Sequence, residues 1–144
     1  MYTQQECRVK WGSVKSSSFP VHNGVKQGGV LSPLLFSIYL DTLLCELASC
    51  GYGSYIGNKF MGAMAYADDI VLLSPSLGGL RQMLKVCEKF SDDFDILFNP
   101  AKSKMLLFNA ANDFHPLKMR GLAIPVSEGE KHLGSFIYNY RTGQ

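Results

Sequence analysis

The sequence has no pair of cysteines at C-x-x-C spacing, although it contains four cysteines: Cys7, Cys45, Cys50 and Cys87. Structural zinc sites are usually built on that spacing, so a zinc site is not expected. The last three cysteines lie in segments with a helical pattern, where small buried thiols are common. We therefore expect all four thiols to be reduced, as in an intracellular protein.

The sequence also lacks an apolar run long enough to cross a membrane. Its longest apolar stretch, Val30–Leu40, is interrupted by Ser32, Pro33 and Ser37, whereas a membrane-spanning helix needs about 20 apolar residues in succession. Residues 1–10 are polar, so no secretory signal peptide is expected. These absences favour a protein of the cytoplasm or nucleus, neither secreted nor attached to a membrane.

A strong excess of charge of one sign is absent as well. The 144 residues carry a net charge of only +2, which is too small to indicate a nucleic-acid-binding protein. The distribution is uneven, because residues 1–40 sum to +3, residues 41–100 to −4 and residues 101–144 to +3. An acidic middle between basic ends suits a metal site beside a surface for a polyanion. An ordinary solvated surface of mixed charge explains the same sums equally well.

The composition, with 47% hydrophobic and 18% charged residues, is that of one globular domain. Near the start, the apolar pattern of Cys7–Trp11 and Ser17–Val21 predicts a hairpin around Gly12. A glycine-rich turn follows at residues 24–29.

Two helices are predicted from capping residues and apolar spacing. Ser32 can cap the first helix with Pro33 at its first position, and Gly51 can end it. Ser74 or Ser76 can cap the second helix. The second helix carries one apolar stripe at helical spacing, which we expect to be core: Leu77, Leu80, Leu84, Cys87, Phe90 and Phe94.

Strands are predicted around and after these helices. Two short apolar runs between the helices predict a hairpin, with an acidic pair at its tip. Together with the helices, the strands predict an α+β fold in which helices pack on one face of an antiparallel sheet. The predicted strands are Lys59–Ala65, Ile70–Leu73, Ile96–Asn99, Ser103–Phe108, Gly121–Pro125 and Phe136–Tyr138.

The acidic pair Asp68-Asp69 at the tip of this hairpin is the main candidate site. Aspartate is disfavoured in strands and like charges repel, although an ordinary polar turn also favours aspartate. The flanking segments 63–67 and 70–73 are nearly all apolar. Two carboxylates delivered by such strands are costly unless a cation neutralises them. Carboxylate oxygens suit Mg²⁺, which takes one or two carboxylates together with substrate phosphates and water.

Phosphoryl transfer fits this chemistry. Two metal ions about 4 Å apart can activate the attacking oxygen and stabilise the leaving oxygen. One hairpin cannot hold both ions well, so a third carboxylate from a neighbouring strand is expected.

Four short motifs in order resemble those of reverse transcriptases. Tyr66-Ala67-Asp68-Asp69 resembles the Tyr-x-Asp-Asp box. Residues 24–36 resemble the Gln-Gly-x-x-Leu-Ser-Pro segment. Residues 99–104 resemble the Asn-x-x-Lys-Ser/Thr motif, and residues 132–134 resemble the aromatic-Leu-Gly turn of the last palm motif. The resemblance extends from Cys7 to about Tyr138. It is strongest to non-LTR retrotransposon enzymes of the jockey or chicken-repeat kind, with group II intron maturases as a rival within the same class.

The resemblance implies roles for the residues of the acidic box. Asp68 is implied as the principal metal ligand and Asp69 as the weaker or outer one. Tyr66 and Ala67 are implied to lie near the primer end and the incoming nucleotide.

The resemblance also implies roles for residues outside the box. Gln27 and Gly28 are implied to lie against the template and the nucleotide, and Gly28 has no Cβ to hinder a base pair. A plain turn before a helix is the alternative for these two. Lys102 is implied to lie near the nucleotide phosphates, where a cation can stabilise developing charge or donate a proton. The alternative for Lys102 is a solvated loop lysine.

The family's first acidic motif is expected before Cys7, and no aspartate stands among residues 1–6; Glu6 has the right charge but the wrong neighbours. Residues 1–144 are therefore expected to be the C-terminal portion of a polymerase palm domain, with the first acidic motif, fingers and thumb absent.

The expected function is that of a fragment of an RNA-directed DNA polymerase from a mobile element. Two-metal nucleotidyl transfer is expected in the intact parent, with Mg²⁺ or Mn²⁺, an RNA template, a DNA primer and dNTP, and the fragment alone is expected to be inactive. The missing upstream part of the polymerase is a further expected partner. One alternative is a non-catalytic remnant that binds RNA or a protein through the palm surface. Another is a chain that folds poorly and has no function.

Overall fold

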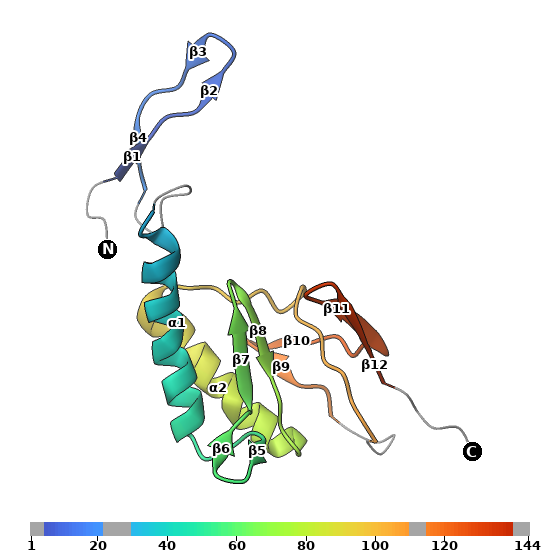
Figure 1. Cartoon of the computed structure of the whole chain (residues 1–144). Coiled ribbons are helices and arrows are strands. Elements are labelled where there is room, and N and C mark those ends of the chain that lie inside the picture. Colours follow the sequence, from blue (N-terminus) through green and yellow to red (C-terminus); the bar gives the residue numbers. More distant parts are fainter. Residues whose placement is uncertain (1–4, 22–29, 110–114, 140–144) are drawn as a thin grey trace.

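The computed structural model describes residues 5–21, 30–109 and 115–139 (Figure 1). Two long helices alternate with short strands. In chain order the elements are β1 (Gln5–Cys7), β2 (Lys10–Trp11), β3 (Val14–Lys15), β4 (Phe19–Val21), α1 (Ser32–Ser49), β5 (Tyr55–Ile56), β6 (Lys59–Phe60), β7 (Ala63–Tyr66), β8 (Asp69–Leu72), α2 (Leu77–Phe94), β9 (Lys118–Met119), β10 (Leu122–Ala123), β11 (Gly129–His132) and β12 (Ser135–Tyr138).

The first four strands form one long antiparallel hairpin, Gln5–Val21, called the N-terminal hairpin below. β1 pairs with β4 near its base, and β2 pairs with β3 near its tip. The chain reverses at Gly12, whose φ of +59° suits a residue without a Cβ. The predicted hairpin around Gly12 is thus confirmed, and in Figure 1 it extends away from the two helices.

Helix α1 runs from Ser32 to Ser49, close to the predicted bounds. The prediction that Ser32 caps it is wrong. Leu31 is the N-cap residue and has a helical backbone (φ −87°, ψ −11°), so the helical conformation begins one residue earlier. The predicted end is confirmed, because Gly51 follows the last turn with a φ of +78°. Within the described residues, neither helix combines the length and the apolar character needed to cross a membrane.

The chain then forms two tight hairpins, β5–β6 and β7–β8. The predicted strand Lys59–Ala65 is wrong in its extent, because the chain bends at Gly62 between β6 and β7. A Cβ at Gly62 would lie 2.9 Å from the Cα of Gly53, so two backbone segments cross there in close contact. The Leu73 amide donates to the Gly62 carbonyl (2.7 Å) and fixes this bend.

Helix α2 begins as predicted at a serine cap. The hydroxyl of Ser76 accepts a hydrogen bond from the amide of Gly79 (3.1 Å). The helix ends where Asp95 adopts a left-handed conformation (φ +56°). The predicted apolar stripe is confirmed, since its members are buried or half-buried against the core, and the prediction missed Met83, which is fully buried.

The segment after α2 contains less strand than predicted. Ile96–Asn99 is irregular, and Ser103–Phe108 contributes only a single bridge, between Met105 and Val126. The predicted strand Gly121–Pro125 is shortened to β10, which pairs with β9, and the predicted Phe136–Tyr138 lies within β12, which pairs with β11. The β9–β10 turn is tied to α2, because the amide of Arg120 donates to Glu88 and its guanidinium pairs with Asp92.

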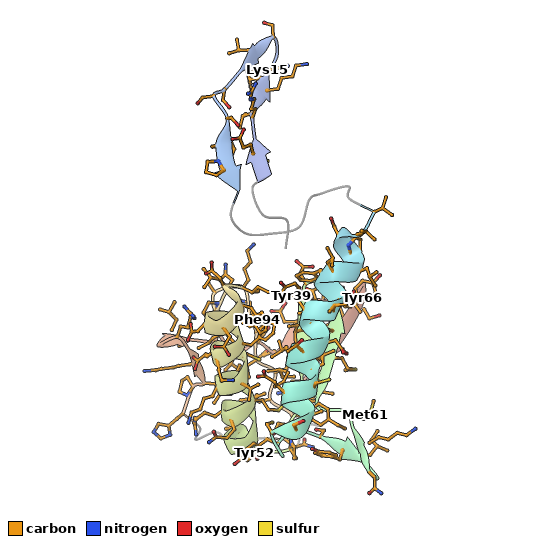
Figure 2. All side chains as sticks on the ribbon, turned by 90° about the vertical axis from the view of Figure 1, so that its left-hand side faces the viewer. Lys15, Tyr39, Tyr52, Met61, Tyr66 and Phe94 are labelled. Carbon is orange, nitrogen blue, oxygen red and sulfur yellow. The ribbon has the colours of Figure 1, made fainter. Side chains whose placement is uncertain are left out.

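The helices lie together on one side of β7–β8, as both Figures 1 and 2 show. Tyr39 of α1 and Phe94 of α2 meet edge to face, with 5.6 Å between ring centroids. The core fills the space between the helices and the strands, and each fully buried large apolar side chain contributes roughly 1.5–3 kcal/mol. Its buried members are Leu43, Leu47, Met83, Leu84, Cys87, Phe90, Met105, Leu117, Met119 and Ile124.

The architecture is α+β, as predicted, but the expected single antiparallel sheet is not found among the described residues. Their strands form six separate antiparallel pairs instead. The cysteines of the helical segments, Cys45, Cys50 and Cys87, were expected to be buried, and Cys45 is not. All four are free thiols, and Cys87 is buried and Cys50 half-buried, whereas Cys7 and Cys45 are exposed.

Candidate functional site

The acidic box lies at the tip of the β7–β8 hairpin, as the sequence predicts. Tyr66, the last residue of β7, is paired directly with Asp69, the first residue of β8. Ala67 and Asp68 therefore form a two-residue turn between the strands. Both carboxylates are exposed at this tip.

The turn depends on an unusual backbone conformation at Ala67. Its φ is +51°, in the left-handed region that residues with a Cβ seldom adopt. A positive φ at the first central residue is a feature of the turns that match the twist of an antiparallel hairpin. The sharp reversal places Asp68 immediately at the end of the hairpin.

The two faces of the hairpin have different surroundings. Paired residues of antiparallel strands point to the same face. The pairs Ala63–Leu72 and Ala65–Ile70 point toward the core, against which Ile70 and Leu72 pack. The Tyr66–Asp69 pair lies on the opposite face, where the side chain of Tyr66 is 65% exposed.

The buried face of β7–β8 explains why the flanking residues are apolar, and the other face is open to solvent. The carboxylates are thus hydrated in the folded chain, and the fold alone does not require a cation to neutralise them. The two ion pairs of the described residues both involve α2, so neither Asp68 nor Asp69 is part of one.

The donors at the tip fit Mg²⁺ or Mn²⁺. Both ions prefer carboxylate oxygens and water, and Mg²⁺ commonly binds one or two carboxylates together with substrate phosphates. Within residues 5–21, 30–109 and 115–139, no group of three or more acidic, histidine or cysteine side chains could hold a metal ion. The expected third carboxylate is therefore not found beside Asp68 and Asp69 in this part of the chain.

Lys102 lies on a turn built by Asn99. The Asn99 side-chain oxygen accepts hydrogen bonds from the amides of Ala101 (3.0 Å) and Lys102 (3.2 Å). The Asn99 carbonyl accepts from the amide and the hydroxyl of Ser103, each at 3.0 Å, and also from the Lys102 amide (3.2 Å). Asn99 thereby fixes the backbone that carries the exposed Lys102.

A structural role for Asn99 was not predicted from the sequence. The signal that could have revealed it is the residue type, because an asparagine side chain commonly accepts a hydrogen bond from the backbone two residues later. The described contacts do not join Lys102 to the carboxylates. Gln27 and Gly28, the other two predicted binding residues, lie outside the described residues.

The end of α2 that precedes the Asn99 turn lies toward the same end of the molecule as the acidic tip. In Figure 2, the labelled Phe94 and Tyr66 stand at similar height, with Tyr39 of α1 between them. The helix pair therefore supports both the hairpin and the start of the segment that leads to Lys102.

A comparison with known families bears on the whole of this arrangement. The profile of the family described as reverse transcriptase (RNA-dependent DNA polymerase) matches residues 1–135. The chain belongs to the reverse transcriptase family. The matched stretch contains the acidic box, residues 24–36 and the Asn99 turn.

Several retrotransposon proteins are similar to this reverse transcriptase chain. The Pol polyprotein of the R2DM element of Drosophila melanogaster is 44% identical over 69 residues, which is 48% of the chain. The polyprotein of the R2 element of Nasonia vitripennis is 31% identical over 106 residues, 74% of the chain. The RNA-directed DNA polymerase of the mobile element jockey, from Drosophila melanogaster, is 24% identical over 127 residues, 83% of the chain.

These similarities confirm the non-LTR retrotransposon character of the sequence, including its likeness to jockey. The chain spans only a small part of each relative, namely 6% of the R2DM protein, 10% of the Nasonia protein and 13% of the jockey protein.

Proposed function

We propose that this chain is part of an RNA-directed DNA polymerase of a mobile element, and that its β7–β8 tip binds the catalytic metal. The observation that carries the proposal is the pair of adjacent carboxylates exposed on a two-residue turn, in a chain of the reverse transcriptase family. In this proposal the chain is the C-terminal portion of a palm domain.

The two carboxylates have different settings and are proposed to have different roles. Asp68 occupies the turn itself and is the principal metal ligand. Asp69 begins β8 opposite Tyr66 and is the outer ligand. A bound Mg²⁺ or Mn²⁺ would polarise phosphate oxygens and stabilise the charge that develops during nucleotidyl transfer.

The other residues of the proposed site handle the nucleic acid and the nucleotide. Tyr66 presents an exposed phenol next to the carboxylates, where it is proposed to lie beside the primer end with Ala67. Gln27 and Gly28 are proposed to contact the template and nucleotide. Lys102 is proposed to meet the nucleotide phosphates, since its turn leaves the side chain exposed.

Catalysis is proposed to need further groups from the surrounding polymerase. One hairpin with two carboxylates holds a single ion, whereas two-metal transfer requires ions about 4 Å apart with ligands on both. A third carboxylate outside the described residues would complete such a site. RNA template, DNA primer and dNTP are the proposed substrates.

A metal titration of the chain tests the ligand assignment. Adding Mn²⁺ to ¹⁵N-labelled protein is expected to broaden the amide signals of residues 66–70 first, because a paramagnetic ion acts on nearby nuclei. Asp68→Asn should remove most of this selective broadening. Asp41→Asn, an equal change of charge on the exposed face of α1, should leave it intact. Broadening that is unchanged in Asp68→Asn would overturn the assignment.

A primer-extension assay on the polymerase that contains this chain tests the function. Incorporation of dNTP on an RNA template should require Mg²⁺ or Mn²⁺. Asp68→Ala should lower the rate roughly a hundredfold or more, the scale on which losing a charge-stabilising group reduces kcat. Full activity in Asp68→Ala, beside an unchanged Asp41→Asn control, would refute the proposed function.

A further inference from the structure

The tip of the N-terminal hairpin presents an aromatic side chain to solvent. Trp11 is 86% exposed and its cross-strand partner Val14 is 70% exposed. The two residues flank the turn at Gly12 and share one face of the hairpin. Large apolar side chains in this position gain little from the fold of the described chain, and their surfaces are open to a ligand.

The opposite face of the tip carries two like charges. Lys10 and Lys15 are directly paired across the strands, an arrangement that destabilises a hairpin when nothing neutralises it. Neither lysine takes part in an ion pair within the described residues. The carboxylate of Glu6 lies toward the base of the hairpin, where it accepts a hydrogen bond from the Ser18 hydroxyl (2.6 Å).

The hairpin as a whole is basic. Residues 5–21 contain Arg8, Lys10 and Lys15 against Glu6, a net charge of +2. Figure 2 shows Lys15 at the far end of the hairpin, away from both helices. An anion placed at this end would relieve the repulsion between the two lysines and would meet no acidic side chain of the tip.

We propose that the tip of the N-terminal hairpin binds a single strand of nucleic acid. Trp11 stacks on an unpaired base, and Lys10 and Lys15 reach around the narrow ribbon to the phosphates on either side of that base. Proteins that bind single strands combine aromatic platforms with cations that follow the backbone. Within the described tip, one aromatic residue and two cations stand on adjacent rungs of a two-stranded ribbon.

The arrangement favours a single strand over a duplex and over a protein. In a duplex the faces of the bases are stacked on their neighbours, so only the lysines would find partners. A protein interface covering Trp11 and Val14 would leave the paired lysines unneutralised at its edge, unless that protein were itself acidic. A nucleic acid strand satisfies the indole and both ammonium groups at once.

This inference deepens the proposed function, since it gives the polymerase a second contact with nucleic acid away from Asp68 and Asp69. It concerns binding alone and needs neither the metal nor catalysis. An RNA template and a DNA primer strand both fit this site, because each is a flexible strand with phosphates and exposed bases.

Trp11 is the sole tryptophan of the chain, so its fluorescence reports directly on the hairpin tip. Titrating residues 1–144 with a 12-nucleotide oligouridylate should quench this fluorescence, because stacking on a base quenches an indole. Oligothymidylate of the same length distinguishes an RNA-specific site from one that takes either strand. A blunt RNA duplex should quench much less than either single strand.

Variants separate the two parts of the proposed site. Lys10→Gln/Lys15→Gln should weaken binding and reduce the slope of log affinity against log salt by about 1.4, since each phosphate contact on a single strand contributes roughly 0.7. Trp11→Ala should weaken binding about fivefold or more when followed by fluorescence anisotropy of a labelled oligonucleotide. Trp11→Phe should restore part of that loss.

A matched control is available elsewhere on the surface. Lys85→Gln/Lys118→Gln removes the same charge from exposed positions on α2 and β9, and it should leave both the quenching and most of the affinity unchanged. An equal loss in this control would show nonspecific attraction and overturn the proposal. Quenching by the oligonucleotides that is absent, or that is equal for the duplex, would overturn it as well.

The test of nucleic-acid binding by the hairpin can fail independently of the test of the proposed function. Asp68→Asn should not affect the quenching, because the carboxylates play no part in this contact. If the hairpin fails to bind while primer extension depends on Asp68, only the inference about the hairpin falls. If the hairpin binds while extension ignores Asp68, only the proposed function falls.

Discussion

Ala67 shows how one residue sets the shape of the acidic tip. Its left-handed backbone (φ +51°) allows the chain to reverse within two residues. For an L-residue with a Cβ this conformation costs about 1–2 kcal/mol. The four residue pairs of β7–β8 hold the strands in register and stabilise the turn against that cost. The carboxylates of Asp68 and Asp69 consequently stand at the end of a stiff support.

Ala67→Gly is expected to stabilise the chain. Glycine adopts a positive φ without the steric cost, although it loses more freedom on folding. The net gain in the free energy of unfolding should be roughly 0.5–1 kcal/mol. Urea unfolding followed by circular dichroism measures it. Ala65→Gly, in the regular part of β7, should instead lower the free energy of unfolding by about 0.5–1 kcal/mol. A destabilised Ala67→Gly would show that the turn is not strained.

At the scale of elements, the turn at Asn99 gives order to a segment that has no strand. Its side chain and carbonyl together accept hydrogen bonds from Ala101, Lys102 and Ser103. Backbone groups committed to such a turn cannot also join a strand ladder. The same contacts therefore explain the fixed backbone of Lys102 and why no strand continues through Asn99 into residues 101–103.

Asn99→Ala should loosen this turn. Removing the acceptor for two amides at an exposed site should lower the free energy of unfolding by about 1 kcal/mol. Hydrogen exchange at the amides of Ala101 and Lys102, measured by NMR, should become faster. Asn99→Asp retains an acceptor oxygen and should preserve slow exchange. Unchanged exchange at Lys102 in Asn99→Ala would mean that the Asn99 carbonyl alone holds the turn.

Elements specified by local signals were predicted well from the sequence. The serine cap and apolar stripe of α2 lie within one segment, and so do the glycine turn of the N-terminal hairpin and the turn residues of the acidic tip. Elements that depend on distant contacts were predicted poorly. The division of Lys59–Ala65 depends on Gly62 crossing Gly53, and the single bridge at Met105 depends on Val126.

The candidate site also combines residues whose placement follows from local sequence with residues whose placement does not. The exposure of Asp68 and Asp69 at a hairpin tip follows from neighbouring residues, so the sequence predicts it. The placement of Lys102 follows from the Asn99 turn and from the path of the chain after α2, which no local pattern specifies.

At the scale of the whole molecule, the two helices and β9 share one core, and Cys87 lies within it. Burial, together with the smaller effects of the nearby Glu88 and Cys50, raises the pKa of the Cys87 thiol from 9.0 to about 12. The folded thiol thus stays neutral at a pH where the unfolded thiol ionises. Its contribution to stability is complete below about pH 9 and is lost as the pH rises toward 12.

Urea unfolding across this range should reveal the effect. Between pH 9 and pH 12, the Cys87 thiol should lower the free energy of unfolding by at most about 1.4 kcal/mol for each unit of pH. Cys87→Ala is expected to be less stable at neutral pH but to show a shallower decline. Cys45→Ala removes an exposed thiol and should decline like the parent chain. Equal slopes in all three proteins would rule out Cys87 as the cause.

The six separate strand pairs also bear on how the chain reaches its native state. Each pair joins strands of the same hairpin, so the residues that must meet are close in sequence. Pairs of this kind lose little loop entropy when they form, because only a short loop is closed. Hairpins form within about 1–10 μs. We therefore expect the meeting of α1 with α2 to be a slower step than formation of the acidic tip that lies between them in the sequence.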